Sequence, residues 1–179
     1  MSSVNFNGYF LGNPVTGAYE IREDCSVIWS LQDDSGGFQH FAGRASPDGS
    51  KIEFHQTDPG SGVHGTLEKV AGGCTTASFQ GRFAFTLGGT STPFEQARVR
   101  VVAEKAVADA DGNGHVTLTE GGVRRRGTYE VDNDCFTKIA YEGTNLRGII
   151  VRGGGEILAI QTDPKVSAAG RLTRIETAQ

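Results

Sequence analysis

The chain has 179 residues, enough for one domain with a substantial core or for two very small ones. Its 26 glycines are scattered without a period, which favours many tight turns and excludes collagen. With 17 basic and 21 acidic residues, the formal net charge is −4. That balance argues against a nucleic-acid binder, which needs a basic face, and no apolar run approaches the ~20 residues that cross a membrane.

The first part of the chain predicts a series of short strands. Apolar side chains at alternate positions, often aromatic or β-branched, are typical of half-buried strands. The expected strands cover residues 4–10, 18–22, 27–31, 38–45, 51–56 and 64–70. Asn13-Pro14 is a turn signal between the first two, and Pro47-Asp48-Gly49 predicts a hairpin.

The second part of the chain continues the same alternation. Strands are expected over residues 79–87, 98–104, 115–119, 128–131, 138–142, 146–152, 156–161 and 167–175. Residues 93–110 are rich in alanine, glutamate and lysine, so a helix is the alternative there, although the apolar positions fit a strand at 98–104 better. Arg124-Arg125-Arg126 looks exposed.

Three blocks of the sequence recur in the same order, which indicates an internal duplication. Gly17–Cys25 (GAYEIREDC) returns as Gly127–Cys135 (GTYEVDNDC). Residues 56–59 return as 161–164, and residues 65–70 return as 170–175. Residues 1–75 therefore form a first module that lacks counterparts of the strands at 79–87 and 98–104, and residues 76–179 form a second, fuller module.

The fold class that follows is all-β, an antiparallel β-barrel built from two tandem homologous modules, the first of them truncated. We expect the two modules to form one compact structural unit. Turns every 8–12 residues are typical of a sandwich or barrel. Closing the sheet into a barrel hides the edges that many short strands would otherwise expose.

The two modules differ on one face of a strand. Glu53 and His55 stand where the second module has Leu158 and Ile160. A strand that is apolar on both faces is covered on both faces. The outer surface of the second module is therefore expected to pack against the first module or against another subunit, as in a homodimer.

The three cysteines are expected to be free thiols. The N-terminal residues have neither a basic region nor an apolar core, so no signal peptide is expected and a cytoplasmic location follows. Reducing compartments disfavour disulfides. Cys25 and Cys135 are repeat equivalents with Cys74 between the modules, and a Cys25–Cys135 disulfide is the alternative if the modules face each other.

Residues 109–120 match the spacing of an EF-hand calcium loop, from Asp109 through Gly114 to Glu120. The context differs, because Gly121-Gly122 would end an exit helix and residues 115–119 alternate like a strand. Asp111-Gly112-Asn113-Gly114 is also a natural hairpin tip, which is the favoured interpretation. The cysteines and histidines show no zinc spacing, so no metal and no cofactor is expected.

Several polar and aromatic side chains fall on the apolar face of their strands and should point inward. They are Tyr19, Trp29, Tyr129, Tyr141, Gln56 and Gln161. An inward hydroxyl or amide must find a hydrogen-bond partner, either within the protein or on a ligand in an apolar cavity. Glu53 and His55 share the opposite face, where they are either an acid/base pair or an ordinary solvent-exposed pair beside Lys51.

The compact, turn-rich pattern over the whole chain resembles the allene oxide cyclase and dirigent barrels, and small natural-product cyclases of the Diels–Alderase type. The repeated Gly-x-Tyr-Glu…Asp-Cys module also resembles uncharacterised small bacterial and fungal β proteins. What the cyclase resemblance implies is a cofactor-free cyclase or isomerase acting on an apolar, polyketide- or lipid-like small molecule. No catalytic motif of those families matches residue by residue.

In that hypothesis a dry cavity enforces a reactive shape, and polar groups face the developing charge. Tyr129 and Tyr19 are the first candidates for those groups, with Glu53 and His55 as a second pair. The side chains predicted to line the substrate pocket are Trp29, Phe54, Gln56, Tyr141 and Gln161. The alternatives are a lipocalin-like carrier without chemistry and a structural or interaction module whose interior is filled by its own side chains.

Overall fold

The structure, a computed structural model, describes residues 2–6, 9–13, 15–32, 36–70, 72–92 and 99–175. The described residues from 15 to 69 belong to one compact unit and those from 70 to 175 to another. We call them the first and the second unit. The division falls slightly before the module boundary expected at residue 75.

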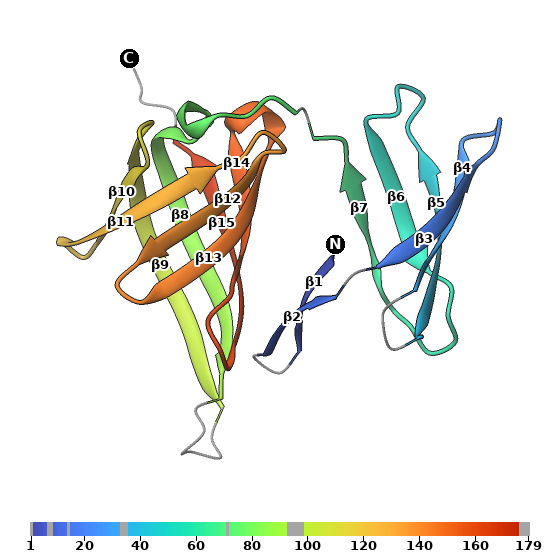
Figure 1. Cartoon of the computed structure of the whole chain (residues 1–179), viewed down its shortest axis with the longest axis horizontal. Coiled ribbons are helices and arrows are strands. Elements are labelled where there is room, and N and C mark those ends of the chain that lie inside the picture. Colours follow the sequence, from blue (N-terminus) through green and yellow to red (C-terminus); the bar gives the residue numbers. More distant parts are fainter. Residues whose placement is uncertain are drawn as a thin grey trace. The chain divides into compact units, whose positions relative to one another are not determined.

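The first unit contains an open antiparallel sheet of five strands in sequence order (Figure 1). The strands are β3 (Thr16–Ile21), β4 (Ser26–Gln32), β5 (Phe38–Ala45), β6 (Lys51–Gln56) and β7 (His64–Glu68). A separate two-stranded sheet pairs β1 (Ser2–Phe6) with β2 (Tyr9–Asn13) in the region where one strand over 4–10 was expected. Residues 7 and 8 lie outside the described residues.

The second unit is a closed barrel of eight antiparallel strands (Figure 1). They are β8 (Gln80–Ser91), β9 (Arg100–Asp111), β10 (His115–Glu120), β11 (Val123–Val131), β12 (Phe136–Tyr141), β13 (Thr144–Val151), β14 (Glu156–Gln161) and β15 (Val166–Arg174). Pairing of β15 with β8 and of β8 with β9 closes the sheet. Two short 3₁₀ turns, η1 (Thr76–Ser78) and η2 (Arg152–Gly154), complete the unit.

The expected fold class, all-β with an antiparallel barrel and a truncated first module, is confirmed. The barrel, however, is made by the second module alone. Strands β3 to β7 correspond to β11 to β15. The barrel of the second module is closed by β8, β9 and β10, and the five-stranded sheet of the first module has no counterparts of these three strands. The helix considered for 93–110 does not form over its described part, where β9 runs from Arg100 to Asp111, and residues 93–98 lie outside the described residues.

The two copies repeat their turns in detail. The amide of Cys25 donates to the Arg22 carbonyl at 2.9 Å, and that of Cys135 donates to the Asp132 carbonyl at 3.0 Å. Each cysteine has a positive φ, 65° and 67°, in the same turn between corresponding strands. The glycine of the repeated motif is required for the same reason in both copies, because a side chain there would clash with the neighbouring strand. A Cβ on Gly127 would meet Tyr141 Cβ at 2.9 Å and the backbone of the neighbouring strand.

The interior of the barrel is filled by its own side chains. Phe79, Phe83 and Phe85 are fully buried, and aliphatic side chains from the other strands pack around them. Phe79 packs edge-on against Phe83 and at 4.6 Å against the ring of Tyr129. Such interdigitation is how small eight-stranded barrels form a core.

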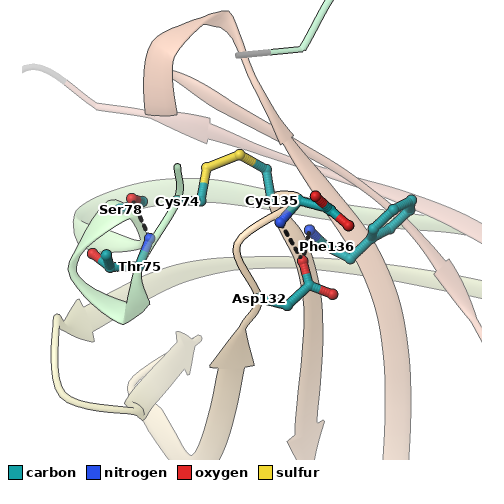
Figure 2. Close-up of a disulfide and its surroundings, with 7 residues drawn as sticks. Cys74, Thr75, Ser78, Asp132, Cys135 and Phe136 are labelled. Carbon is teal, nitrogen blue, oxygen red and sulfur yellow. Dashed lines mark hydrogen bonds between the residues drawn. A yellow bond between two sulfur atoms is a disulfide. The ribbon is translucent and has the colours of Figure 1, made fainter. Parts of the chain in front are cut away.

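A disulfide joins Cys74 to Cys135 and anchors the segment that enters the barrel (Figure 2). This corrects two expectations from the sequence, because these two thiols are not free and Cys135 does not pair with Cys25. The Thr75 amide donates to Ser78 Oγ at 3.0 Å, which shapes η1 beside the disulfide. The bond thereby holds η1 and the buried Phe79 over one end of the barrel.

Candidate functional site

The side of the first sheet that corresponds to the barrel interior carries most of its large apolar side chains. We call it the open face and define it by three cross-strand rows. The first row is Tyr19, Trp29, Phe41 and Gln56, the second is Ile21, Val27, Gly43, Phe54 and Gly65, and the third is Ala45, Ile52 and Leu67. The same rows line the barrel of the second unit, beginning with Tyr129, Ile139, Leu146 and Gln161.

Matched positions of the two units differ sharply in burial. Tyr19 is 78% exposed, whereas its equivalent Tyr129 is 3% exposed. Leu67 is 46% exposed, whereas its equivalent Leu172 is 2% exposed. In the second unit these positions lie next to the strands that close the barrel, since β11 pairs with β10 and β15 pairs with β8. The exposure in the first unit therefore follows from its missing strands.

An aromatic cluster occupies the middle of the open face. Trp29 stacks on Phe41 with ring centroids 5.1 Å apart, and Phe54 meets both rings edge-on. The Phe54 ring also covers Gly65, where an added Cβ would lie 2.9 Å from Cζ. In the second unit, Leu87 and Phe85 of β8 cover the equivalent Gly170 instead. The cluster therefore supplies part of the volume that β8 supplies in the barrel, and leaves the two edges of the face uncovered.

Both edges of this sheet are open. Within the described residues, β3 pairs with β4 alone and β7 pairs with β6 alone. An edge strand presents unpaired N–H and C=O groups, which can accept a further strand. The opposite face of the same sheet is mainly polar, with Lys51 Nζ 2.7 Å from Glu53 Oε1, although Ile28 and Phe38 are exposed there. The open face is thus the more apolar of the two faces.

The two tyrosines predicted to act together lie in different units. Tyr129 is buried, and its hydroxyl donates to the Thr76 carbonyl at 3.3 Å. Burial raises the pKa of this phenol above its ordinary value. Tyr19 lies on the exposed edge of the open face. The structure therefore gives Tyr129 a hydrogen-bond partner within its own unit, the Thr76 carbonyl.

Glu53 and His55 lie on the polar outer face of β6. The hydrogen bond from Lys51, followed by its charge, lowers the pKa of the Glu53 carboxyl. His55 is opposite His64 on β7. Glu53 is held by Lys51, which is the arrangement of an ordinary solvent-exposed strand face.

The two glutamines have the same role in both copies. Gln56 Nε2 donates to Asp58 Oδ2 and Gln161 Nε2 donates to Asp163 Oδ2, each at 2.8 Å. The two aspartates also accept backbone amides from the preceding hairpin strand, at 2.8 Å and 2.9 Å. These amides therefore brace the Gln-Thr-Asp-Pro turn. The two glutamines differ at the side-chain oxygen, because Gln161 Oε1 is buried without a hydrogen-bond partner.

Tyr141 belongs to a half-buried polar cluster that the sequence did not reveal. Its hydroxyl donates to Glu104 Oε2 at 3.0 Å, and Arg125 donates to the other oxygen of the same carboxylate. Burial, with the charge of Glu104 next, raises the pKa of Tyr141. Burial alone would lower the pKa of Arg125, but the hydrogen bond and charge of Glu104 raise it. The cluster lies at the end of β12 away from the disulfide.

Arg125 was expected to be exposed with its neighbours, and this is wrong. Its side chain is 17% exposed, and its guanidinium lies 5.4 Å from the centre of the Tyr141 ring. The signal was available, because Arg125 has the same parity along β11 as Tyr129. Three consecutive arginines concealed that alternation.

Residues 111–114 form a hairpin turn between β9 and β10, as favoured from the sequence. Asp111 Oδ1 accepts the amides of Asn113 and His115 at 2.7 Å and 3.0 Å. The carboxylate of Asp111 is thus engaged in shaping the turn. Among the residues that the structure describes, no cluster of three or more His, Cys, Asp or Glu is placed to hold a metal ion.

A shallow pocket of about 590 Å³ lies over β11, β12 and β13. Its polar wall includes Glu130 and Lys138, whose charged groups are 3.4 Å apart and mostly exposed. The remaining wall is formed by Arg147, by threonine, asparagine and alanine, and by the margins of core residues. An exposed ion pair of this kind provides little that would orient a reacting group. The open face is therefore the stronger candidate site.

No family model matches the chain, and no curated protein matches it. A solved structure, the glycoside hydrolase family 43 protein YxiA from Bacillus licheniformis, aligns with 90% of this chain at 10% identity and a TM-score of 0.39. The chain covers 35% of that protein. No helix in the described part of the chain is long and apolar enough to span a membrane.

Proposed function

We propose that the chain is a protein-interaction module, in which the second unit is a self-contained structural barrel and the open face of the first unit binds another polypeptide. The occupant adds one or more β-strands to the sheet and covers its apolar side. The observation that carries this proposal is the contrast between Leu67, 46% exposed, and its buried equivalent Leu172. Binding by strand addition uses backbone hydrogen bonds for affinity and alternate side chains for specificity.

The strand that closes the barrel shows what chemistry the occupant needs. In the second unit, Phe85 of β8 lies opposite Leu172, and Leu87 lies opposite Gly170. Since Phe54 already covers the equivalent Gly65 in the first unit, an occupant should be small where β8 has Leu87. We therefore expect an extended segment with a large apolar residue opposite Leu67 and a small one two positions later.

The cyclase and carrier hypotheses stay predictions, as does the resemblance to allene oxide cyclase and dirigent barrels. Both functions need an interior cavity. The candidate residues are divided between two units, and the barrel interior is occupied by Phe79, Phe83 and Phe85. These observations support the interaction function over the other two.

The sole tryptophan provides the test, because Trp29 lies on the open face and the second unit has none. The probe is a synthetic peptide with the sequence of residues 80–91 carrying Leu87→Ala. Covering three partly exposed apolar side chains is worth about 4 kcal/mol before ordering costs, so the dissociation constant should be on the order of 1 mM. We expect a blue shift of tryptophan emission and less quenching by acrylamide.

Two variants on β7 provide matched controls. Leu67→Ser removes an apolar contact on the open face and should weaken peptide binding at least five-fold. Thr66→Ser changes the neighbouring residue on the opposite face and should leave binding unchanged. An emission spectrum that does not respond to several millimolar peptide, or an equal response of both variants and the parent protein, would refute the proposed function.

A further inference from the structure

Cys25 occupies the same backbone site as the disulfide-bonded Cys135. Besides matching φ values, the carbonyls of the two cysteines accept equivalent amides, from Ala45 and Ile150, each at 2.9 Å. The direction of the Cα–Cβ bond relative to the sheet is therefore the same in both units. Cys135 is bonded to Cys74, whereas Cys25 is a free, half-buried thiol.

The partner of Cys135 comes from the segment that leads into the closing strands. Cys74 lies just ahead of η1, and β8 then pairs along β15. In the first unit β7 takes the place of β15. A segment that added to β7 as β8 adds to β15 would bring its preceding residues to Cys25, as the second unit brings Cys74 to Cys135.

We infer that the occupant of the open face is a cysteine-bearing strand segment, and that Cys25 fixes it covalently through a disulfide. This rests on the proposed function and names its partner more closely, as a polypeptide with a cysteine shortly before its first strand. The reaction is thiol–disulfide exchange. The Cys25 thiolate attacks a disulfide that the incoming cysteine forms with a low-molecular-weight thiol such as glutathione, a new S–S bond forms, and glutathione leaves as the thiolate.

The exchange is selective because the segment binds the open face first and its cysteine reacts with Cys25 afterwards. A free thiol that is only partly exposed reacts slowly with arbitrary disulfides, because access limits the attack. Strand addition would place the incoming sulfur beside Cys25 and raise its effective concentration to the millimolar range or above. A segment that binds the open face should therefore react faster than one that carries the same cysteine but cannot bind.

The experiment uses the full chain, whose Cys74 and Cys135 are already joined, so Cys25 is the reacting thiol. The probe is a peptide with the sequence of residues 72–91 carrying Leu87→Ala, its Cys74 converted to the mixed disulfide with glutathione. Intact mass and peptide mapping should show addition at Cys25 with release of one glutathione. The rate should exceed that of a peptide with the same cysteine and a scrambled strand at least ten-fold.

Three controls separate the outcomes. Cys25→Ser should abolish addition yet keep the change in Trp29 emission, and Leu67→Ser should slow addition in proportion to weaker binding. A normal emission change with addition no faster than for the scrambled peptide would overturn the covalent link and leave the proposed function standing. Neither emission change nor addition would overturn both. Chains joined Cys25 to Cys25, formed in preference to the peptide adduct, would show that the occupant is a second copy and also overturn the inference.

Discussion

Removing the disulfide of the second unit should destabilise the barrel strongly and leave the first unit unchanged. The perturbation is the double variant Cys74→Ala/Cys135→Ala, which leaves no unpaired thiol. Alanine retains the Cβ of cysteine, so the strain of the positive φ at residue 135, 67°, is the same before and after. What changes is the cross-link itself and its hold on η1 and Phe79.

The magnitude follows from the length of chain that the bond closes. The two cysteines are 61 residues apart in sequence. The loss of loop-closure entropy in the unfolded chain then corresponds to roughly 4 kcal/mol at 25 °C. For a barrel of this size, 1 kcal/mol shifts the melting temperature by about 4–8 °C, so we expect a decrease of roughly 15–30 °C.

The assay separates the two units. Calorimetry and far-ultraviolet circular dichroism report both units, of which the barrel is the larger, while the emission of Trp29 follows the first unit alone. Cys25→Ser is the matched control, because it removes a thiol at the equivalent turn without breaking a bond. A double variant whose barrel melts within about 3 °C of the parent protein would refute the argument, as would an equal shift in the tryptophan transition.

The polar cluster of Tyr141 and the core contacts give three further predictions. Glu104→Gln removes the nearer of two carboxylates from the half-buried Arg125 guanidinium, which keeps Glu120 at 3.2 Å, and should cost about 1–2 kcal/mol in urea unfolding, whereas Glu130→Gln, in an exposed pair, should cost less than about 0.5 kcal/mol. Gly127→Ala places a Cβ against the backbone of β12 and should cost about 1–3 kcal/mol, while Gly88→Ala, with open space around it, should be close to neutral; similar stability of the two would contradict the geometry. Hydrogen bonds from the His40 amide, the Gln56 side chain and the His40 ring lower the pKa of Asp58 to about 2, below its ordinary 3.8, so the stability it provides is complete above pH 4 and is lost as pH falls toward 2. Acid titration of tryptophan emission should show that loss, and Asp58→Asn should flatten it.

Strands and the duplication were accessible from the sequence because both depend on local patterns. Period-two alternation gave the bounds of β5, β6 and β14 directly. The repeated glycine, tyrosine and cysteine positions marked equivalent turns, and the structure repeats their hydrogen bonds. Parity also assigned Tyr129 and Tyr141 correctly to the interior.

The sequence does not show which strands or side chains cover each face of the two sheets. Parity places Tyr19 and Tyr129 on the same side of their strands, yet their exposure differs because only one of them is next to closing strands. The disulfide was missed for a similar reason. Cys74 has no counterpart in the first copy, so comparing the copies favoured the symmetric pair and not the bond that forms.

Cysteine at a left-handed turn position has a consequence for how the two copies can diverge. A side chain held at positive φ costs roughly 1–3 kcal/mol relative to glycine, which adopts that conformation freely. At residue 135 a covalent bond offsets the cost, but a thiol that never reacted would offset nothing at residue 25. Mutation and selection for stability would then favour glycine or asparagine there. Among natural variants of this chain, cysteine at position 25 should therefore be kept most often where the first sheet is closed by a cysteine-bearing segment.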